Sequence, residues 1–230
     1  MENNLVNKAR IAVMGIGGAG CNVISSLYRM AAPFHTIAVN TDKAVLVSSS
    51  ADSKIYICQG VTNGQGARGD VGLGRNCAEA HIEDVRQAVR GFDAVFIVAG
   101  LGGGTGTGAT ATVARVCHEM GIMTAVYAIQ PFCFEGPRVQ VASKGLESIR
   151  AVCRNVITLS NDALLDCGDL EMDVLFNMFN GKLRDMICQH IDRINVEMNA
   201  RASEVEHLLA TSEVGATEAP LSTSVPVRMQ

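Results

Sequence analysis

A dense run of glycines interleaved with two threonines is the stretch of the sequence best suited to bind a ligand. It extends from Gly100 to Gly108 and contains Thr105 and Thr107. Residues 94–99, just before it, have the composition of a strand buried on both faces, and residues 109–120, just after it, have helical composition. Glycines let successive backbone N–H groups face an anion, and the positive end of the helix dipole favours negative charge. The stretch therefore predicts a phosphate-binding site; a flexible glycine linker would not be flanked in this way.

A second glycine cluster follows the first apolar run of the chain. Residues 10–14 read as a strand, and a G-x-G-x-x-G arrangement from Gly15 to Gly20 precedes an expected helix at residues 22–30. Asp42 lies about 20 residues further on, where a dinucleotide-binding dehydrogenase would bind the ribose. Any phosphate-binding turn before a helix requires the same glycines. This motif alone therefore fits either a dehydrogenase or another phosphate-binding protein.

Polar or glycine-rich clusters follow each expected strand. The expected strands are residues 10–14, 36–39, 54–58, 94–99, 123–129 and 156–159, and the expected helices are residues 22–30, 75–90, 109–120 and 139–152. Strands alternating with helices predict an α/β fold, a three-layer, doubly wound parallel sheet with right-handed crossovers. The clusters would then meet at the carboxyl edge of the sheet and form a single site.

Composition excludes several classes of protein. The chain has 230 residues, enough for one core, and a formal net charge of -4 without any block rich in Lys or Arg, which argues against nucleic-acid binding by a basic surface. Neither a signal sequence nor an apolar run long enough to span a bilayer is apparent, so we expect a cytoplasmic protein. The 8 cysteines are scattered singly, which argues against a zinc site or a disulfide framework.

One protein family matches all of these loops at once. The matching motifs are GIGGAGCN from Gly15, Asn40-Thr41-Asp42, GQGARGDVGLGR from Gly64, GGGTGTG from Gly102, PFCFEG from Pro131 and NDALL from Asn161. Together they resemble the nucleotide loops of FtsZ, the bacterial tubulin homologue, and GGGTGTG is the tubulin/FtsZ signature. The resemblance covers residues 10–194 and implies the nucleotide-binding fold of that family. A second glycine loop has no place in a dehydrogenase, which is therefore set aside.

The resemblance implies GTP or GDP as the ligand, together with Mg²⁺, for which it assigns no side-chain ligand here. The residues that it places in the phosphate loops are Gly17, Gly18, Ala19, Gly20, Asn22, Asn40, Asp42, Gly66, Ala67, Arg68, Gly102, Gly103, Gly104, Thr105, Gly106 and Thr107.

Further residues would hold the ribose and the base. Glu135, in a loop that begins at Pro131, would accept hydrogen bonds from ribose hydroxyls. Arg138 would lie near the phosphates or the base, in a loop one residue shorter than the family's usual pattern. Asn161 would read the guanine edge, because an amide both donates and accepts hydrogen bonds. Phe176 would either stack on the base or pack in the core, and the sequence places Asn180 one turn further along the same helix.

Two departures from the family's usual pattern concern selectivity and catalysis. Gly181 stands where many relatives have Asp, which bears on guanine selectivity. Arg68 stands where the family usually has glycine, in the loop that senses the γ-phosphate. A guanidinium there could form a bidentate phosphate contact or extend into solvent.

The long helix expected at residues 172–194 is apolar on one side and polar on the other, which predicts that no second domain of this chain covers it. In the family this helix leads to an acidic loop that positions the attacking water on the next subunit's nucleotide. Asn195 and Glu197 echo only the first positions of that loop. We therefore expect GTP binding with slow or absent hydrolysis. An active GTPase, with Arg68 or Glu197 as the catalytic residue, is the alternative.

Residues 1–197 are expected to form the GTP-binding domain, including a long helix at about 170–197, and residues 198–230 a short helical extension and a flexible tail. The leading interpretation is a structural cytoskeletal protein that self-associates into filaments or membrane-remodelling assemblies, as in cell division. A monomeric regulator of full-length FtsZ is a further alternative. The expected partners are further copies of the chain, another FtsZ-like protein, or a membrane-associated adaptor that would hold the protein at the inner face of the membrane; nucleic acid is not among them.

Overall fold

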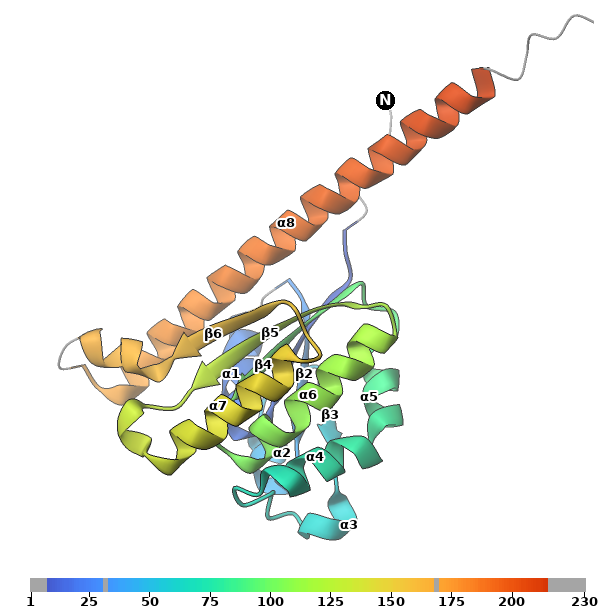
Figure 1. Ribbon diagram of the computed structural model, residues 1–230. Coiled ribbons are helices and arrows are strands. Elements are labelled where there is room, and N and C mark those ends of the chain that lie inside the picture. Colours follow the sequence, from blue (N-terminus) through green and yellow to red (C-terminus); the bar gives the residue numbers. More distant parts are fainter. Residues whose placement is uncertain (1–7, 31–32, 168–169, 215–230) are drawn as a thin grey trace, which may run out of the picture. The chain divides into compact units, whose positions relative to one another are not determined.

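The computed structural model describes residues 8–30, 33–167 and 170–214 (Figure 1). Its strands are β1 (Ile11–Ile16), β2 (His35–Asn40), β3 (Ser53–Tyr56), β4 (Ala94–Gly100), β5 (Met123–Gln130) and β6 (Val156–Ser160). Its α-helices are α1 (Gly17–Arg29), α2 (Lys43–Ser48), α3 (Gln59–Thr62), α4 (Val71–Ala80), α5 (Ile82–Val89), α6 (Gly104–Glu119), α7 (Pro137–Arg150) and α8 (Met172–Val214). Two 3₁₀ helices, η1 (Cys133–Glu135) and η2 (Asn161–Cys167), precede α7 and α8.

The chain divides into two compact units. The first is Ala9–Ile191, which contains the whole sheet and the first part of α8. The second includes the chain from Asp192 onward, where α8 continues as a helix as far as Val214. No helix in the described part of the chain is both long and apolar enough to cross a membrane.

The sheet has six strands in the order β3-β2-β1-β4-β5-β6, and every pairing is parallel. The predicted doubly wound parallel sheet is therefore confirmed. The strand order reverses direction between β1 and β4, which lie side by side with Gly15 opposite Val98. A ligand-binding crevice forms at the carboxyl ends of the strands at such a switch point. Both glycine loops, one after β1 and one after β4, open there.

Helices cover both faces of the sheet. On one face α4, α5, α6 and α7 lie together, as Figure 1 shows in front of the strands. Alternate side chains of each strand meet these helices in the largest apolar cluster, to which β1 contributes Ala12, Met14 and Ile16. On the other face α1 packs on β1, β2 and β4. Strands buried on both sides explain why the strand sequences are continuous apolar runs rather than alternating ones.

The first part of α8 is held to the sheet by apolar and polar contacts. Leu175, Leu183 and Ile187 are fully or almost fully buried. In addition, the hydroxyl of Tyr127 on β5 lies 2.5 Å from Nδ1 of His190. Burial, and secondarily the nearby thiol of Cys188, raise the pKa of Tyr127, so the phenol stays protonated and is able to donate this hydrogen bond.

The helices expected at residues 22–30 and 109–120 begin five residues earlier than predicted, as α1 and α6, and two further expected helices also differ from the structure. The helix expected at residues 75–90 begins four residues earlier, where the Asp70 side chain caps α4 by accepting a hydrogen bond of 3.0 Å from the Leu73 N–H. It also breaks at His81, whose Nε2 accepts a hydrogen bond of 2.9 Å from the Cys58 N–H. The long helix expected at about 170–197 and the short helical extension expected after it form one continuous helix, α8, which ends at Val214. The predicted flexible tail, from residue 215 onward, lies outside the described residues.

The expectation that disulfides are absent is wrong. Cys58 and Cys77 are joined by a disulfide, with their Cα atoms 5.0 Å apart. Cys58 has a left-handed backbone, with φ of 68°, which turns the chain after β3 back toward α4. The two cysteines are 19 residues apart in sequence, and the fold brings them together.

Candidate functional site

A cavity of about 590 Å³ opens at the carboxyl edge of the sheet, beside the loops that follow β1 and β4. This volume falls within the range of roughly 300–1,000 Å³ that is usual for small-molecule sites. The residues that line it are Gly18, Ala19, Gly100, Leu101, Gly103, Gly104, Thr105, Gly106, Ile129, Pro131, Phe132, Phe134, Glu135, Arg138, Asn161, Met172 and Phe176. They come from five separate parts of the chain, which the strand order brings to one place.

Two helices begin at this cavity with uncapped N-termini. The N-cap residues of α1 and α6 are Ile16 and Gly103, and neither makes a side-chain capping hydrogen bond. Neither helix has an acidic residue in its first turn. In contrast, α2 and α4, which do not line the cavity, are capped by Asp42 and Asp70. The first N–H groups of α1 and α6 are therefore free to bind an anion, and both helix dipoles favour negative charge there.

Glycine is needed at the cavity for two separate reasons. A Cβ on Gly17 would lie 2.8 Å from the Gly106 nitrogen, and a Cβ on Gly106 would lie 2.3 Å from the Gly100 oxygen, so these residues let the two loops touch. A Cβ on Gly18 or Gly103 would meet no protein atom within 4 Å. These two glycines line the open cavity, where a side chain would occupy ligand space. The loops thus form a concavity of backbone N–H groups.

Threonine hydroxyls fix the shape of the loop after β4. Thr105 and Thr41 share a hydrogen bond of 2.7 Å between their hydroxyls, which joins α6 to the loop after β2. The hydroxyl of Thr107 accepts a hydrogen bond of 2.9 Å from the N–H of Gly102, whose φ of 94° only glycine adopts readily. The loop is therefore held in place before any ligand binds.

The wall of the cavity contains one ion pair. Glu135 accepts a hydrogen bond of 2.9 Å from the N–H of Phe132 and is paired with the guanidinium of Arg138. The Nε of Arg138 also lies 3.4 Å from the carbonyl oxygen of Gly102. Arg138 thus links the loop after β5 to the glycine loop after β4. A carboxylate has room for about four hydrogen bonds, so Glu135 can still accept bonds from ligand hydroxyls.

Besides glycines and this ion pair, the wall of the cavity contains aromatic and apolar side chains and one amide. Phe132 and Phe134 stack with ring centroids 5.0 Å apart. Phe176 and Met172 reach the cavity from α8 and are 38% and 45% exposed. Phe176 is therefore available to a ligand and does not pack in the core. The side-chain amide of Asn161 makes no hydrogen bond to the described part of the protein, so its donor and acceptor are both free.

Half of the residues predicted from the sequence line the cavity directly: Gly18, Ala19, Gly103, Gly104, Thr105, Gly106, Pro131, Glu135, Arg138, Asn161 and Phe176. Gly17, Gly20, Ala67, Gly102 and Thr107 lie just behind them, in contact with the glycine loops. Asn40, Asp42 and Gly66 belong to the neighbouring loops and support them. The amide oxygen of Asn40 accepts a hydrogen bond of 3.2 Å from the N–H of Asp42, and a Cβ on Gly66 would lie 3.3 Å from that of Asp42.

The other predicted residues do not line the cavity. Asn22 is exposed on α1 and Asn180 is half-buried on α8. Arg68 is exposed in the loop before α4, and Glu197 is exposed in the second unit. The lining residues that the site prediction missed are Gly100, Leu101, Ile129, Phe132, Phe134 and Met172. Except for Met172, each lies at the carboxyl end of a strand or in the loop just after it, and that position was the available signal.

Within the described ranges, no three His, Cys, Asp or Glu side chains are grouped to bind a metal ion. A cation at this site would therefore take most of its ligands from the phosphates of a bound nucleotide and from hydroxyls such as that of Thr105. Mg²⁺, which commonly binds through substrate phosphates and retains several waters, fits this donor set.

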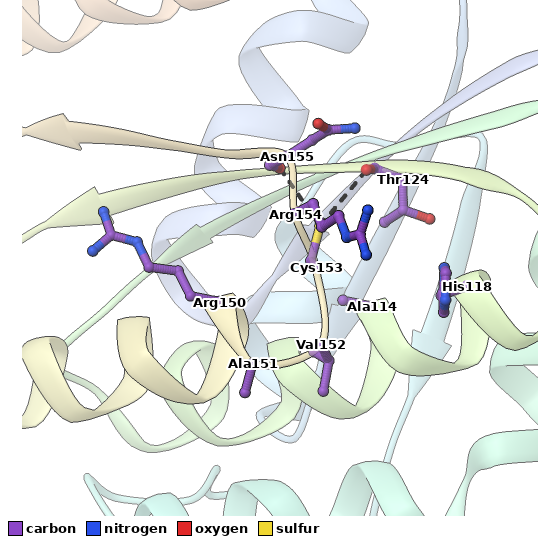
Figure 2. Close-up of a pocket in the computed structure, with 9 residues that line it drawn as sticks. All are labelled: Ala114, His118, Thr124, Arg150, Ala151, Val152, Cys153, Arg154 and Asn155. Carbon is purple, nitrogen blue, oxygen red and sulfur yellow. Dashed lines mark hydrogen bonds between the residues drawn. The ribbon is translucent and has the colours of Figure 1, made fainter.

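A second cavity, of about 610 Å³, lies at the amino edge of the sheet (Figure 2). It is lined by the ends of α6 and α7, the start of β5 and the loop before β6, with Arg150, Arg154 and His118 among its residues. The carboxyl ends of helices carry partial negative charge, which Arg150 in the last turn of α7 balances. It has no glycine loop and no helix N-terminus. The phosphate chemistry predicted from the sequence therefore belongs to the cavity at the carboxyl edge.

Thiol alkylation gives a direct check of the geometry beside the site. Burial raises the pKa of the Cys117 thiol to about 12 and also raises the pKa of Cys21 and Cys153. Cys133, between two residues that line the cavity, is exposed. Iodoacetamide at neutral pH is expected to modify Cys133 well before these three buried thiols, because thiolate and access are both required. Peptide mass spectrometry would show the order, and early labelling of Cys117 would contradict the packing of α6.

Comparisons with known proteins agree with this geometry. The model of the Tubulin/FtsZ family, GTPase domain, matches residues 10–169. Cell division protein FtsZ of Neisseria meningitidis is 35% identical over 190 residues, which are 81% of this chain and 48% of the relative. The chain thus spans about half the length of the curated relatives it matches.

Solved structures show the same similarity. The empty FtsZ dimer of M. jannaschii superposes with a TM-score of 0.75 at 32% identity, over 82% of this chain and 56% of that one. The GTPγS-bound protofilament of CetZ2 from Haloferax volcanii superposes with a TM-score of 0.69 at 27% identity, over 83% of this chain and 58% of that one. The sequence motifs and the two glycine loops after β1 and β4 agree with these matches. The chain belongs to the tubulin/FtsZ family, within its GTPase domain.

Proposed function

We propose that this protein binds GTP and GDP with Mg²⁺ at the cavity on the carboxyl edge and works as a self-associating, FtsZ-like cytoskeletal protein. The observation that carries the proposal is the meeting of two uncapped helix N-termini, those of α1 and α6, across a cradle of glycines. Free N–H groups, two helix dipoles and room left by missing Cβ atoms form a site for a chain of phosphates. Membership of a GTPase family supports the same ligand.

The part of the cavity lined by Asn161 and Phe176 suits guanine as the base. Asn161 offers a free amide that both donates and accepts, which matches the edge of guanine. Phe176 offers an exposed ring on which a base can stack, and such stacking contributes roughly 0.5–1.5 kcal/mol beyond burial. Glu135 lines the same cavity, and its carboxylate can accept hydrogen bonds from ribose hydroxyls. Selectivity for guanine then rests on Asn161, since Asn180 does not line the cavity.

Hydrolysis by this chain is proposed to be slow or absent. In the family an acidic loop after the long helix positions water on the neighbouring subunit's nucleotide. Here α8 continues as an unbroken helix through Asn195 and Glu197, so these residues do not form such a loop. Positioned acid–base groups contribute about 10²–10⁴ to a rate. An active GTPase that uses Arg68 or Glu197 instead would show phosphate release at ordinary rates.

Self-association is proposed from the relatives. An FtsZ dimer and a CetZ2 protofilament are among the structures that this fold resembles. A head-to-tail contact between copies does not close, so it would propagate into a filament. The proposed partners are therefore further copies of this chain, with another FtsZ-like protein or a membrane-associated adaptor as additional ones. A role in cell division or membrane remodelling at the inner face of the membrane would follow.

Replacing Thr105 by valine tests the ligand site. The variant removes one hydroxyl from the cavity and its hydrogen bond to Thr41 while keeping the side-chain shape. We expect affinity for both GTP and GDP to fall by roughly tenfold, as hydrogen bonds to charged groups are worth about 1.5–3 kcal/mol. Isothermal titration measures this. Thr124→Val, at the amino edge and bonded to the Ile122 carbonyl, is the matched control and should bind normally.

Electron microscopy and phosphate release separate the functional alternatives. Filaments with GTP and little phosphate release would support the proposal, while filaments with rapid release would identify an active GTPase. A protein that binds GTP but stays monomeric would instead be a regulator of a longer homologue. Absence of any guanine-nucleotide binding at millimolar concentration would disprove the proposed function as a whole.

A further inference from the structure

One edge of the sheet is suited to pairing with a further strand, and the other edge is not. The sheet ends at β3 on one side and at β6 on the other (Figure 1). β3 has only 4 residues and carries the exposed Lys54, and a charged side chain on a short edge strand discourages further pairing. β6 has 5 residues, VITLS, without lysine, proline or glycine. Its composition favours a strand, and no residue within it blocks the edge.

The register of β6 with β5 shows which backbone groups of β6 point away from the sheet. The carbonyl oxygen of Asn155 accepts a hydrogen bond of 2.8 Å from the N–H of Val126 on β5. Successive residues of a strand direct their N–H and C=O groups to opposite sides in turn, so every second residue after Asn155 also faces β5. The N–H groups of Val156, Thr158 and Ser160 therefore point outward. No segment that the structure describes pairs with them.

A second copy of β6 fits this edge when it runs antiparallel to the first about a two-fold axis at Thr158. Thr158 would then face its own copy and Val156 would face Ser160, and such facing pairs exchange N–H···O hydrogen bonds. On the side of the sheet that α8 covers, Ile157 would lie beside Leu159 of the second copy. Leu159 already lines an apolar groove against α8, so the two side chains would extend an existing apolar surface. A two-fold contact of this kind closes at a dimer.

The charges beside β6 complement each other in this arrangement. Arg154 and Asp162 lie equally far along the chain from Thr158, so each would come opposite the other across the axis. Arg154, drawn in Figure 2, is exposed and makes no hydrogen bond or ion pair with any residue that the structure describes. Asp162 accepts a hydrogen bond of 2.9 Å from the Cys133 N–H but has no cationic partner in the described ranges. Arg150, 3.4 Å from the Thr158 hydroxyl, is exposed, so water and salt would screen the repulsion between its two copies.

We propose that this protein forms a two-fold dimer in which β6 pairs with β6 of a second copy, so that the two sheets become one continuous sheet. This contact differs from the head-to-tail association proposed above. It uses neither a nucleotide nor the cavity at the carboxyl edge, and it does not depend on the proposed nucleotide function. Because the paired strands run in opposite directions, two head-to-tail filaments joined through β6 would also run in opposite directions.

Thr158→Pro tests the pairing while leaving the bonds to β5 in place. Proline lacks the outward N–H, and edge strands tolerate proline in this orientation. Without nucleotide, wild-type protein is expected to sediment as a dimer at micromolar concentration, and the dimer dissociation constant of the variant is expected to rise by about tenfold or more. Thr158→Lys, which places like charges opposite each other, should also weaken the dimer. Val61→Lys, at a 66% exposed position on α3, is the matched control and should sediment as wild type does.

Cross-linking identifies the surface that the dimer uses. In a Cys133→Ser background, which removes an exposed thiol, Thr158→Cys should give a covalent dimer with a short bismaleimide, because facing residues have Cα atoms about 5.5 Å apart. Val61→Cys should not. A monomeric wild type, equal cross-linking of the two cysteine variants, or a dimer unchanged in Thr158→Lys would overturn the proposal. Circular dichroism checks the fold of each variant, and Thr158→Lys and the cross-link decide the matter if Thr158→Pro unfolds.

Discussion

Gly106→Ala is expected to disrupt both the fold of the loop and nucleotide binding. The added methyl would lie 2.3 Å from the Gly100 oxygen and 3.4 Å from the Ile16 oxygen. Both are backbone atoms at the ends of β4 and β1, so no side chain can rotate away. The N-terminus of α6 would have to move off the strands. We expect a loss of about 1–3 kcal/mol or more in the free energy of unfolding, together with loss of measurable GTP affinity.

Gly181→Ala is the matched control for this prediction. It makes the same chemical change inside a helix of the same unit, but its Cβ would meet nothing within 4 Å. It should stabilise the protein by about 0.5–1 kcal/mol, because alanine favours a helix interior more than glycine does. Urea denaturation followed by circular dichroism measures both variants. If Gly106→Ala unfolds at the wild-type urea concentration and still binds GTP, then α6 does not pack on the strand ends as described.

The second large effect is expected from Leu183→Ala. Leu183 is 1% exposed and anchors the first part of α8. Truncation of a buried leucine costs about 2–5 kcal/mol, from lost transfer free energy and the cavity left behind. Because α8 also presents Met172 and Phe176 to the nucleotide cavity, a loosened α8 should weaken binding of the base. We therefore expect lower affinity for GTP and GDP alike.

Met178→Ala tests whether that effect comes from burial. Met178 lies on the same helix and is 44% exposed. Its truncation should change stability by no more than about 0.5 kcal/mol and leave nucleotide affinity unchanged. Equal destabilisation by the two variants would mean that α8 is not anchored through Leu183. Thermal denaturation and nucleotide titration, carried out side by side, decide between these outcomes.

The strands and the glycine loops were readable from the sequence because each has a strong local cause. Strands buried on both faces require continuous apolar runs, and the six expected strands agree with the observed ones within two residues at each end. The loops are visible in the sequence as clusters of glycines, and at positions such as Gly17 and Gly106 a side chain would clash with the neighbouring backbone. The prediction of one site at the carboxyl edge followed from parallel strands alone, and the cavity with its lining residues lies there.

Features that depend on contacts between distant segments were not readable. The helix expected at residues 75–90 leaves out the first turn of α4, which contains Gly72 and Gly74, and a Cβ on Gly74 would lie 2.3 Å from the Gly104 oxygen. Glycine is thus used inside this helix for close packing against α6, a reason that pattern alone does not reveal. Met172 was likewise assigned to the apolar side of its helix. That side also reaches the cavity, so the same periodicity serves two purposes.

The disulfide between Cys58 and Cys77 makes the redox environment a variable of this protein's behaviour. The cross-link closes a covalent ring that includes Arg68, and this ring persists when the chain unfolds. A closed loop of this size limits the unfolded chain and, in entropic models, stabilises the native state by about 3 kcal/mol. The free energy of unfolding of the same polypeptide would therefore differ between a thiol-rich cytosol and an oxidising buffer.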